Sequence, residues 1–148
     1  MDDIPARKIG EVVGGDAFAK ATTYWSPWSV AGPGLAGVAG VPNLSGTGTL
    51  EGGTVNALTL TSAKPFAPAV LGISLVSVPV PFKGGTFTAQ PLALVVPMGT
   101  LFDGSIPLSF GWPAGVPAST SIWFQYLVQD NAAVQGVALS TAVKAVTP

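Results

Sequence analysis

The chain has 148 residues, the size of one ordinary domain, and only 9% of them are charged, against roughly 25% in a typical soluble domain. Apolar residues make up 48%, and the missing charge is replaced by Gly, Pro, Ser and Thr; there is no Cys and no His, and the net charge is −1. This composition excludes disulfides, thiolate or imidazole metal sites, His- or Cys-dependent catalytic triads, and nucleic-acid binding through a basic face.

The N-terminal part differs from the rest in charge. Seven of the thirteen charged residues lie in the first twenty positions. We expect a short helix there, capped by Asp2 or Asp3. The stretch Val30–Pro42 has no periodicity and is rich in Gly and Pro, so it predicts an extended strap without regular structure. The predicted organisation is therefore an N-terminal arm and strap over residues 1–44 and a folded domain over residues 45–148.

Targeting and membrane signals are not expected. The first residues are acidic and no apolar segment follows them, in contrast to a secretory signal. The charge-free stretch Pro65–Phe82 is interrupted by prolines and is too short to cross a membrane. The sequence therefore predicts a protein made in a reducing compartment, without membrane contact.

From Thr54 onward, the sequence predicts short strands separated by turn residues. In one strand, Asn56, Leu58 and Leu60 share a face. The expected strands are Thr54–Ser62, Ala69–Val78, Thr86–Gln90, Leu92–Val96, Ser105–Phe110, Ser121–Gln129 and Val134–Val146. Turn signals separate them at Glu51-Gly52-Gly53, Lys83-Gly84-Gly85, Asp103-Gly104, Pro113-Ala114-Gly115 and Asp130-Asn131. About seven or eight strands at this spacing predict an all-β fold, an antiparallel β-sandwich, with a closed barrel as the alternative.

Several short motifs are similar to a known domain. They are Gly-Thr-Gly-Thr at 46–49, a Leu-Thr-Leu strand followed by Ala-Pro-Ala-Val-Leu, Ser-Ile-Pro-Leu at 105–108, Gly-Val-Pro at 115–117, Phe-Gln-Tyr-Leu-Val-Gln-Asp at 124–130, and Gly136 leading to Ala-Leu-Ser at 138–140. Over Gly46–Pro148 the chain resembles a β-sandwich domain that recurs in secreted, surface-associated proteins of environmental bacteria. The resemblance implies a fold and carries no chemistry.

Candidate sites for chemistry are weak. The letters Gly-Pro-Gly-Leu-Ala-Gly at 32–37 match a dinucleotide fingerprint, but neither the strand before nor the helix after it is predicted. Glu51, Asp103 and Asp130 adjoin turns and are interpreted as solvated turn residues rather than an acid–base pair. No histidine is present to activate a serine. We therefore expect no enzyme activity, no catalytic residues, no cofactor and no metal.

The aromatic residues are the most informative side chains. Tyr24, Trp25 and Trp28 fall within five residues, and Trp112 is expected at a loop tip. They either cover an open edge of their own sandwich, anchor into a neighbouring subunit as interface aromatics do, or stack on sugar rings. We name these four as predicted interface residues. Trp123 is expected to pack inside the sandwich.

The surface composition favours assembly. Six charges serve the last 128 residues, and the mean hydropathy is +0.54, so a free monomer is expected to associate. The first hypothesis is a non-enzymatic structural subunit of a large symmetric assembly, most concretely a bacteriophage virion protein that decorates or cements the capsid. Its partners would be copies of itself and the capsid shell protein, joined in the host cytoplasm through the arm. The alternative is an extracellular or cell-surface module for carbohydrate binding or adhesion.

Overall fold

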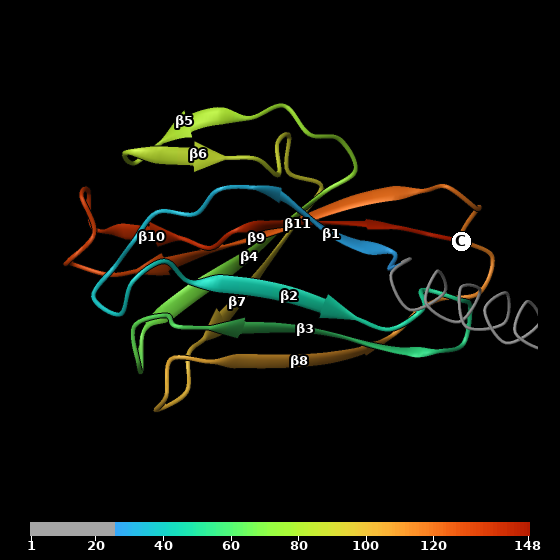
Figure 1. Ribbon diagram of the computed structural model, residues 1–148, viewed down its shortest axis with the longest axis horizontal. Coiled ribbons are helices and arrows are strands. Elements are labelled where there is room, and N and C mark those ends of the chain that lie inside the picture. The colour runs from blue at the N-terminus through green and yellow to red at the C-terminus, as the bar shows by residue number, and fades with distance from the viewer. Residues whose placement is uncertain (1–25) are drawn as a thin grey trace, which may run out of the picture.

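The computed structural model describes residues 26–148 as an all-β protein with antiparallel sheets packed together (Figure 1). This confirms the predicted class, an antiparallel β-sandwich. In the described part of the chain, no helix is long and apolar enough to cross a membrane. The eleven strands are β1 (Trp28–Gly32), β2 (Asn43–Thr47), β3 (Val55–Thr61), β4 (Pro68–Ser74), β5 (Val80–Phe82), β6 (Gly85–Phe87), β7 (Leu94–Gly99), β8 (Ile106–Gly111), β9 (Ser121–Gln129), β10 (Val137–Leu139) and β11 (Ala142–Val146).

The larger sheet has six strands in the order β1-β11-β9-β4-β7, with β10 added beside β9. Its central strand β9 has the predicted bounds, and its alternate residues point into the sandwich. Three of the inward residues, Phe124, Tyr126 and Val128, are buried, and they lie opposite Ile73, Leu71 and Ala69 of β4. The core therefore forms on the face that the alternation predicted.

The smaller sheet has three strands in the order β2-β3-β8. Asn56, Leu58 and Leu60 of β3 are almost completely buried, which confirms the predicted face. The amide of Asn56 is buried with partners: its oxygen accepts from Leu50 N at 3.0 Å and its nitrogen donates to Thr54 O at 3.3 Å. These bonds satisfy a polar group that would otherwise be costly in the core.

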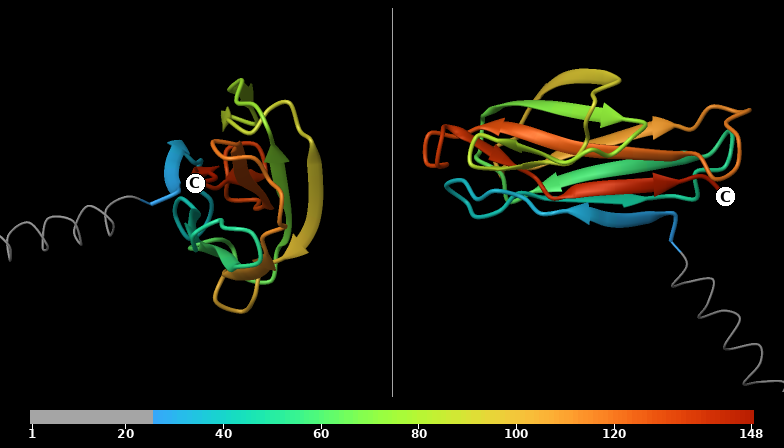
Figure 2. Two further views of the ribbon diagram at one scale, coloured as in Figure 1. Left: turned by 90° about the vertical axis from the view of Figure 1, so that its right-hand side faces the viewer. Right: turned by 90° about the horizontal axis from the view of Figure 1, so that it is seen from above.

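A hairpin of β5 and β6 lies outside the sandwich, over the outer face of the larger sheet (Figures 1 and 2). Lys83 and Gly84 join its strands, and both have positive φ, as the predicted turn requires. Gln125 of β9 holds the chain beyond β6. Its Oε1 accepts from Thr88 N at 2.8 Å, and its Nε2 donates to Ser140 O at 2.9 Å and Thr86 O at 3.2 Å.

The boundary between arm and sandwich differs from the prediction. Residues 26–44 belong to the sandwich: β1 pairs with β11, and β2 pairs with β3. Between them, Leu35 exchanges two backbone hydrogen bonds with Leu139. The predicted strap therefore contains the end of β1 and an isolated β-bridge at Leu35. Its Gly- and Pro-rich sequence gives no local sign of these pairings, because the backbone partners come from distant segments. The predicted N-terminal helix lies outside the described residues.

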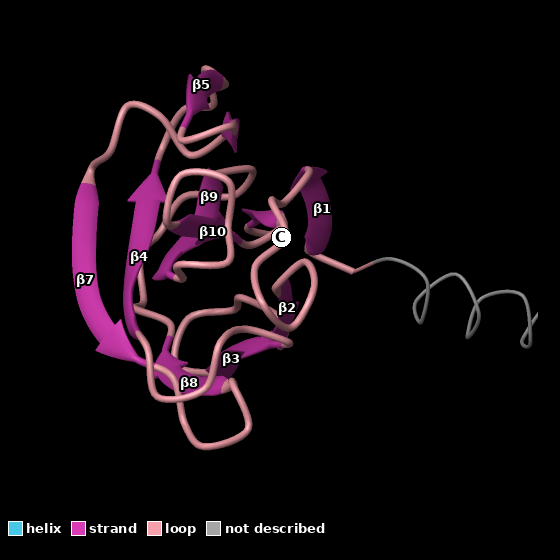
Figure 3. Cartoon of the chain, turned by 90° about the vertical axis from the view of Figure 1, so that its left-hand side faces the viewer, coloured by secondary structure: helices cyan, strands magenta, loops and turns pink. Residues whose placement is uncertain are grey.

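The two sheets differ in width, and this leaves one side of the sandwich open. On the side of β1 and β2, the ring of Trp28 lies between the sheets. On the opposite side, β7 ends the larger sheet and β8 ends the smaller one, and the chain crosses between them through residues 100–105. Figure 3 shows β7 and β4 along one side of the molecule and β8, β3 and β2 along the adjoining side.

Candidate functional site

Trp28, one of the four predicted interface residues, is buried in its own chain. Its exposed fraction is 8%, its ring lies 5.9 Å from that of Phe124 and 6.5 Å from that of Phe110, and its Nε1 donates to Gly48 O at 3.1 Å. A Cβ at Gly46 would collide with the indole, so only glycine lets β2 pass this close. This placement matches the alternative in which the aromatics cover their own sandwich.

Trp112 is also buried, with an exposed fraction of 7%. Its ring lies 6.2 Å from the ring of Phe110, and its backbone bonds to Thr54 and Gly53 tie it to the start of β3. It is therefore not at an exposed loop tip. Its Nε1 is buried and has no hydrogen-bond partner. Tyr24 and Trp25 lie outside the described residues.

Trp123 does not pack between the sheets, contrary to the prediction. It lies on β9 between the inward residues Ile122 and Phe124, so alternation places it on the outer face, where it is partly exposed. The Lys144 ammonium stands 5.3 Å from the ring centroid, a cation–π distance. The alternation of β9 alone predicts the outward position of Trp123, because the residue does not share the two-residue spacing of the core residues on that strand.

The three carboxylates assigned to turns have different environments. Glu51 and Asp103 are exposed, as expected. Hydrogen bonds from Ser105 Oγ and N, at 2.6 and 3.1 Å, hold the pKa of Asp103 below its ordinary value. Asp130, in contrast, is 1% exposed, so its interpretation as solvated is wrong. Its oxygens accept from Val38 N at 2.7 Å and Ala132 N at 2.9 Å.

No metal centre is assembled from the described carboxylates. Within residues 26–148, no three His, Cys, Asp or Glu side chains are placed to hold a metal ion. The carboxylate of Asp130 is occupied by the backbone of a segment 92 residues away, and a Cβ at Gly37 would collide with it. Its arrangement is that of a structural clamp between the Val38 region and the β9–β10 turn.

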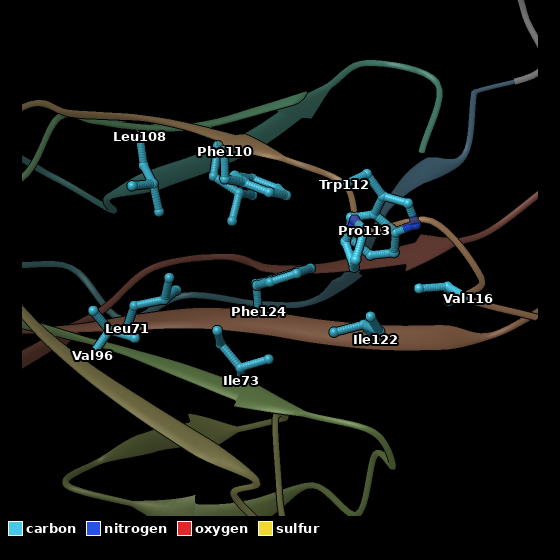
Figure 4. Close-up of a pocket in the computed structure, with 11 residues that line it drawn as sticks. Leu71, Ile73, Val96, Leu108, Phe110, Trp112, Pro113, Val116, Ile122 and Phe124 are labelled. Carbon is cyan, nitrogen blue, oxygen red and sulfur yellow. The ribbon is translucent and has the colours of Figure 1, made fainter. Parts of the chain in front are cut away.

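An apolar cleft lies on the open side of the sandwich (Figure 4). Two rows of side chains face each other across it, one from the β8 side and one from β4 and β9. They are Leu108, Phe110 and Trp112 in the first row and Leu71, Ile73, Ile122 and Phe124 in the second. Val96 of β7 lies at one end of the cleft and Val116 at the other. The wall exposes only apolar atoms.

The size of the cleft distinguishes it from a packing defect. Its volume is about 450 Å³. A sealed cavity lowers the free energy of unfolding by about 24 cal/mol per Å³ of its volume. A closed cavity of this size would therefore cost about 11 kcal/mol, which is comparable with the stability of a whole domain. Ile73, Val96, Leu108 and Ile122 are only partly buried, as expected of a cleft that opens to the outside. It falls in the volume range of ligand pockets.

A second feature is an exposed apolar flank along β7, which we call the β7 flank. Backbone hydrogen bonds join its segments: Val78 N donates to Gln90 O, Ala93 N to Ile73 O, and Phe66 N to Leu101 O. At one end of β7 it comprises Leu75, Val76, Val78, Leu92, Leu94 and Val95, and at the other Phe66, Leu101 and Phe102. The exposed fractions run from 39% for Leu92 to 78% for Phe66, and none of these residues is charged. Sequence reasoning missed this flank because it assigned these residues to strands or turns one at a time.

Comparison of the chain with protein-family models, with curated proteins and with solved structures gives no match.

Proposed function

We propose that the chain is a non-enzymatic structural subunit that joins copies of itself through the β7 flank. The observation that carries the proposal is the presence of nine exposed large apolar side chains at the two ends of β7, the edge strand of the larger sheet. Soluble monomers expose few large apolar side chains close together, and groups of them mark interaction surfaces. The low charge of the chain supports the same conclusion.

The charged side chains of the described residues lie away from one end of the β7 flank, which favours self-association there. Of the charged residues in 26–148, Glu51 lies at the β2–β3 turn, Lys144 on β11, Lys83 at the hairpin tip, and Asp130 is buried. Lys64 and Asp103 adjoin only the Phe66–Phe102 end. The end formed by residues 75–78 and 92–95 carries no charge, so two copies meet there without desolvating an ion.

The test is light scattering coupled to size-exclusion chromatography over a range of protein concentrations. We expect defined oligomers that grow with concentration. Val95→Lys places an ammonium in the flank and is expected to shift the population to monomer. The matched control is Val55→Lys, the same change at an exposed valine of the smaller sheet. A wild-type protein that stays monomeric at every concentration, or equal effects of the two substitutions, would contradict the proposal.

The narrower expectation, a bacteriophage capsid that the subunit decorates or cements, stays a prediction. Its partners would be copies of this chain and the capsid shell protein. Incorporation of the purified protein into capsids that lack it, and loss of incorporation with Val95→Lys but not Val55→Lys, is the corresponding measurement.

The alternative, a carbohydrate-binding or adhesive module, receives less support from the described residues. Sugar stacking needs an accessible ring, and Trp28 and Trp112 are buried. Trp123 is the partly exposed tryptophan of the described part, and the Lys144 ammonium stands over its ring. Glycan-array binding that disappears with Trp123→Ala would favour the alternative.

A further inference from the structure

We propose that the cleft between β8 and the β4–β9 face binds an unbranched hydrocarbon chain that carries an uncharged oxygen, such as a fatty alcohol or an acyl ester. The proposal goes beyond self-association, because it concerns a different surface. Its basis is the chemistry of the wall, which exposes only apolar atoms over a volume of about 450 Å³.

Water is a poor occupant of this cleft. A bound water needs two to four polar partners, and the wall provides none. An apolar molecule instead gains contact with two facing rows of carbon atoms. Leu108, Phe110 and Trp112 are alternate residues along β8 and its continuation, so this row follows the strand direction and is elongated rather than round (Figure 4). A hydrocarbon chain fits such a row better than a compact ring system does.

An added β-strand is a poorer occupant, although β7 and β8 are both sheet edges. Each has a proline within it, Pro97 in β7 and Pro107 in β8, and proline has no N–H to give to an added strand. The N-terminal arm is unsuitable for a second reason. Seven of its first twenty residues are charged, and an apolar wall cannot pair those charges.

The choice of an uncharged oxygen follows from the ends of the cleft. No charged residue lines it, so a carboxylate head would lose hydration without gaining a counter-ion. Trp112 stands toward the Val116 end, and its buried Nε1 has no acceptor. The indole N–H lies behind the apolar surface of the wall, and a rotation of the ring toward the cleft would let a hydroxyl or ester oxygen at this end supply the acceptor that it lacks.

The test uses 1-decanol as the probe and isothermal titration calorimetry on the full chain. We expect saturable binding of one molecule per chain, and weaker binding of decanoate at neutral pH. Val96→Trp places an indole inside the cleft and is expected to weaken decanol binding by about tenfold or more, because it takes up apolar contact area. Val55→Trp, the same change at an exposed valine of β3 that lies outside the cleft and outside the β7 flank, is expected to leave binding unchanged.

A second measurement keeps the proposal testable if Val96→Trp fails to fold. Quenching of tryptophan fluorescence by 10-bromo-1-decanol is expected in the wild type and is expected to fall strongly in Trp112→Phe, which keeps an aromatic ring in the wall. Absence of saturable decanol binding, equal binding by the Val55→Trp and Val96→Trp proteins, or unchanged quenching in Trp112→Phe would overturn the proposal. Light scattering on the same samples reports self-association separately, so the two proposals fail independently.

Discussion

At the residue scale, Asp130 shows how one carboxylate connects segments that are distant in sequence. Its side chain is 1% exposed and accepts backbone hydrogen bonds from Val38 and Ala132. Its own backbone N and O bond to Gly136 and Ala133 within the β9–β10 turn. The residue therefore fixes this turn and, through Val38, the segment between β1 and β2.

Replacing Asp130 with Ala is expected to lower the free energy of unfolding by about 2 kcal/mol or more, because two backbone N–H groups lose their buried acceptor. Urea denaturation followed by tryptophan fluorescence measures the change. The control is Asp103→Ala, which removes an exposed carboxylate that bonds only to Ser105 and is expected to have a smaller effect. Equal losses of stability in the two variants would contradict the role assigned to Asp130.

Tyr126 makes stability depend on pH in the alkaline range. Burial raises the pKa of its phenol to about 12, from an ordinary value of 10. The neutral phenol is the form that the folded protein favours, so its contribution is complete below pH 10 and is lost as the pH rises from 10 through 12. We expect the free energy of unfolding to fall over this interval.

The matched variant for this pH dependence is Tyr126→Phe, which removes the ionisable hydroxyl and its 3.0 Å hydrogen bond to Met98 Sδ. Denaturation at a series of pH values should give a shallower decline for the variant above pH 10. Parallel curves for the two proteins would show that Tyr126 does not cause the decline.

The sequence predicted the environment of some residues and not of others, for a physical reason. The buried face of β3, with Asn56 and Leu58, follows from the strand period alone. The burial of Asp130 depends on Val38, which is 92 positions away, and that of Trp112 depends on its backbone bonds to the segment before β3. The alternation within a strand is enough to predict which face of β3 is buried, whereas the burial of Asp130 and Trp112 is determined by tertiary contacts.

At the scale of elements, strands with strong alternation were predicted well and others were not. The bounds of β9 agree with the prediction, and those of β3 and β8 differ by a residue or so at each end. The single expected strand Val134–Val146 is instead β10 and β11. Between them Ser140 breaks the ladder: its hydroxyl donates to Thr141 O and accepts from Tyr126 N. Strand β1 was missed because its partner β11 lies at the other end of the chain.

Truncation tests the corrected boundary of the sandwich. Removing residues 1–25 keeps every described strand, so this truncated protein is the reference against which the contribution of β1 is measured. Removing residues 1–32 also deletes β1 and Trp28, and loss of a buried tryptophan alone costs about 3–5 kcal/mol. Denaturation curves of both truncated proteins measure the difference. If removal of residues 1–32 left stability intact, β1 would not be part of the folded unit.

At the scale of the whole molecule, the unequal sheets are the property that sequence could not supply. Strand count and spacing predicted a sandwich, but the division into a six-stranded and a three-stranded sheet is set by pairings between distant strands, such as β4 with β9. That division leaves β7 and β8 as free edges and creates both the cleft and the β7 flank. The low charge predicted association, and the β7 flank is the surface that we propose for it.

The response to salt tests whether this apolar edge, rather than charge, holds copies together. Screening by salt weakens contacts between exposed ions, whereas apolar burial persists in NaCl and strengthens in sulfate. We therefore expect sedimentation velocity to show the same or greater association when NaCl rises from about 0.05 M to about 1 M, where the Debye length falls to ~3 Å. Replacement of NaCl by ammonium sulfate should increase association further, and Val95→Lys should reduce it at every salt concentration. Dissociation of the wild-type protein by NaCl would mean that ion pairs hold the copies together, and the β7 flank would then not be the interface.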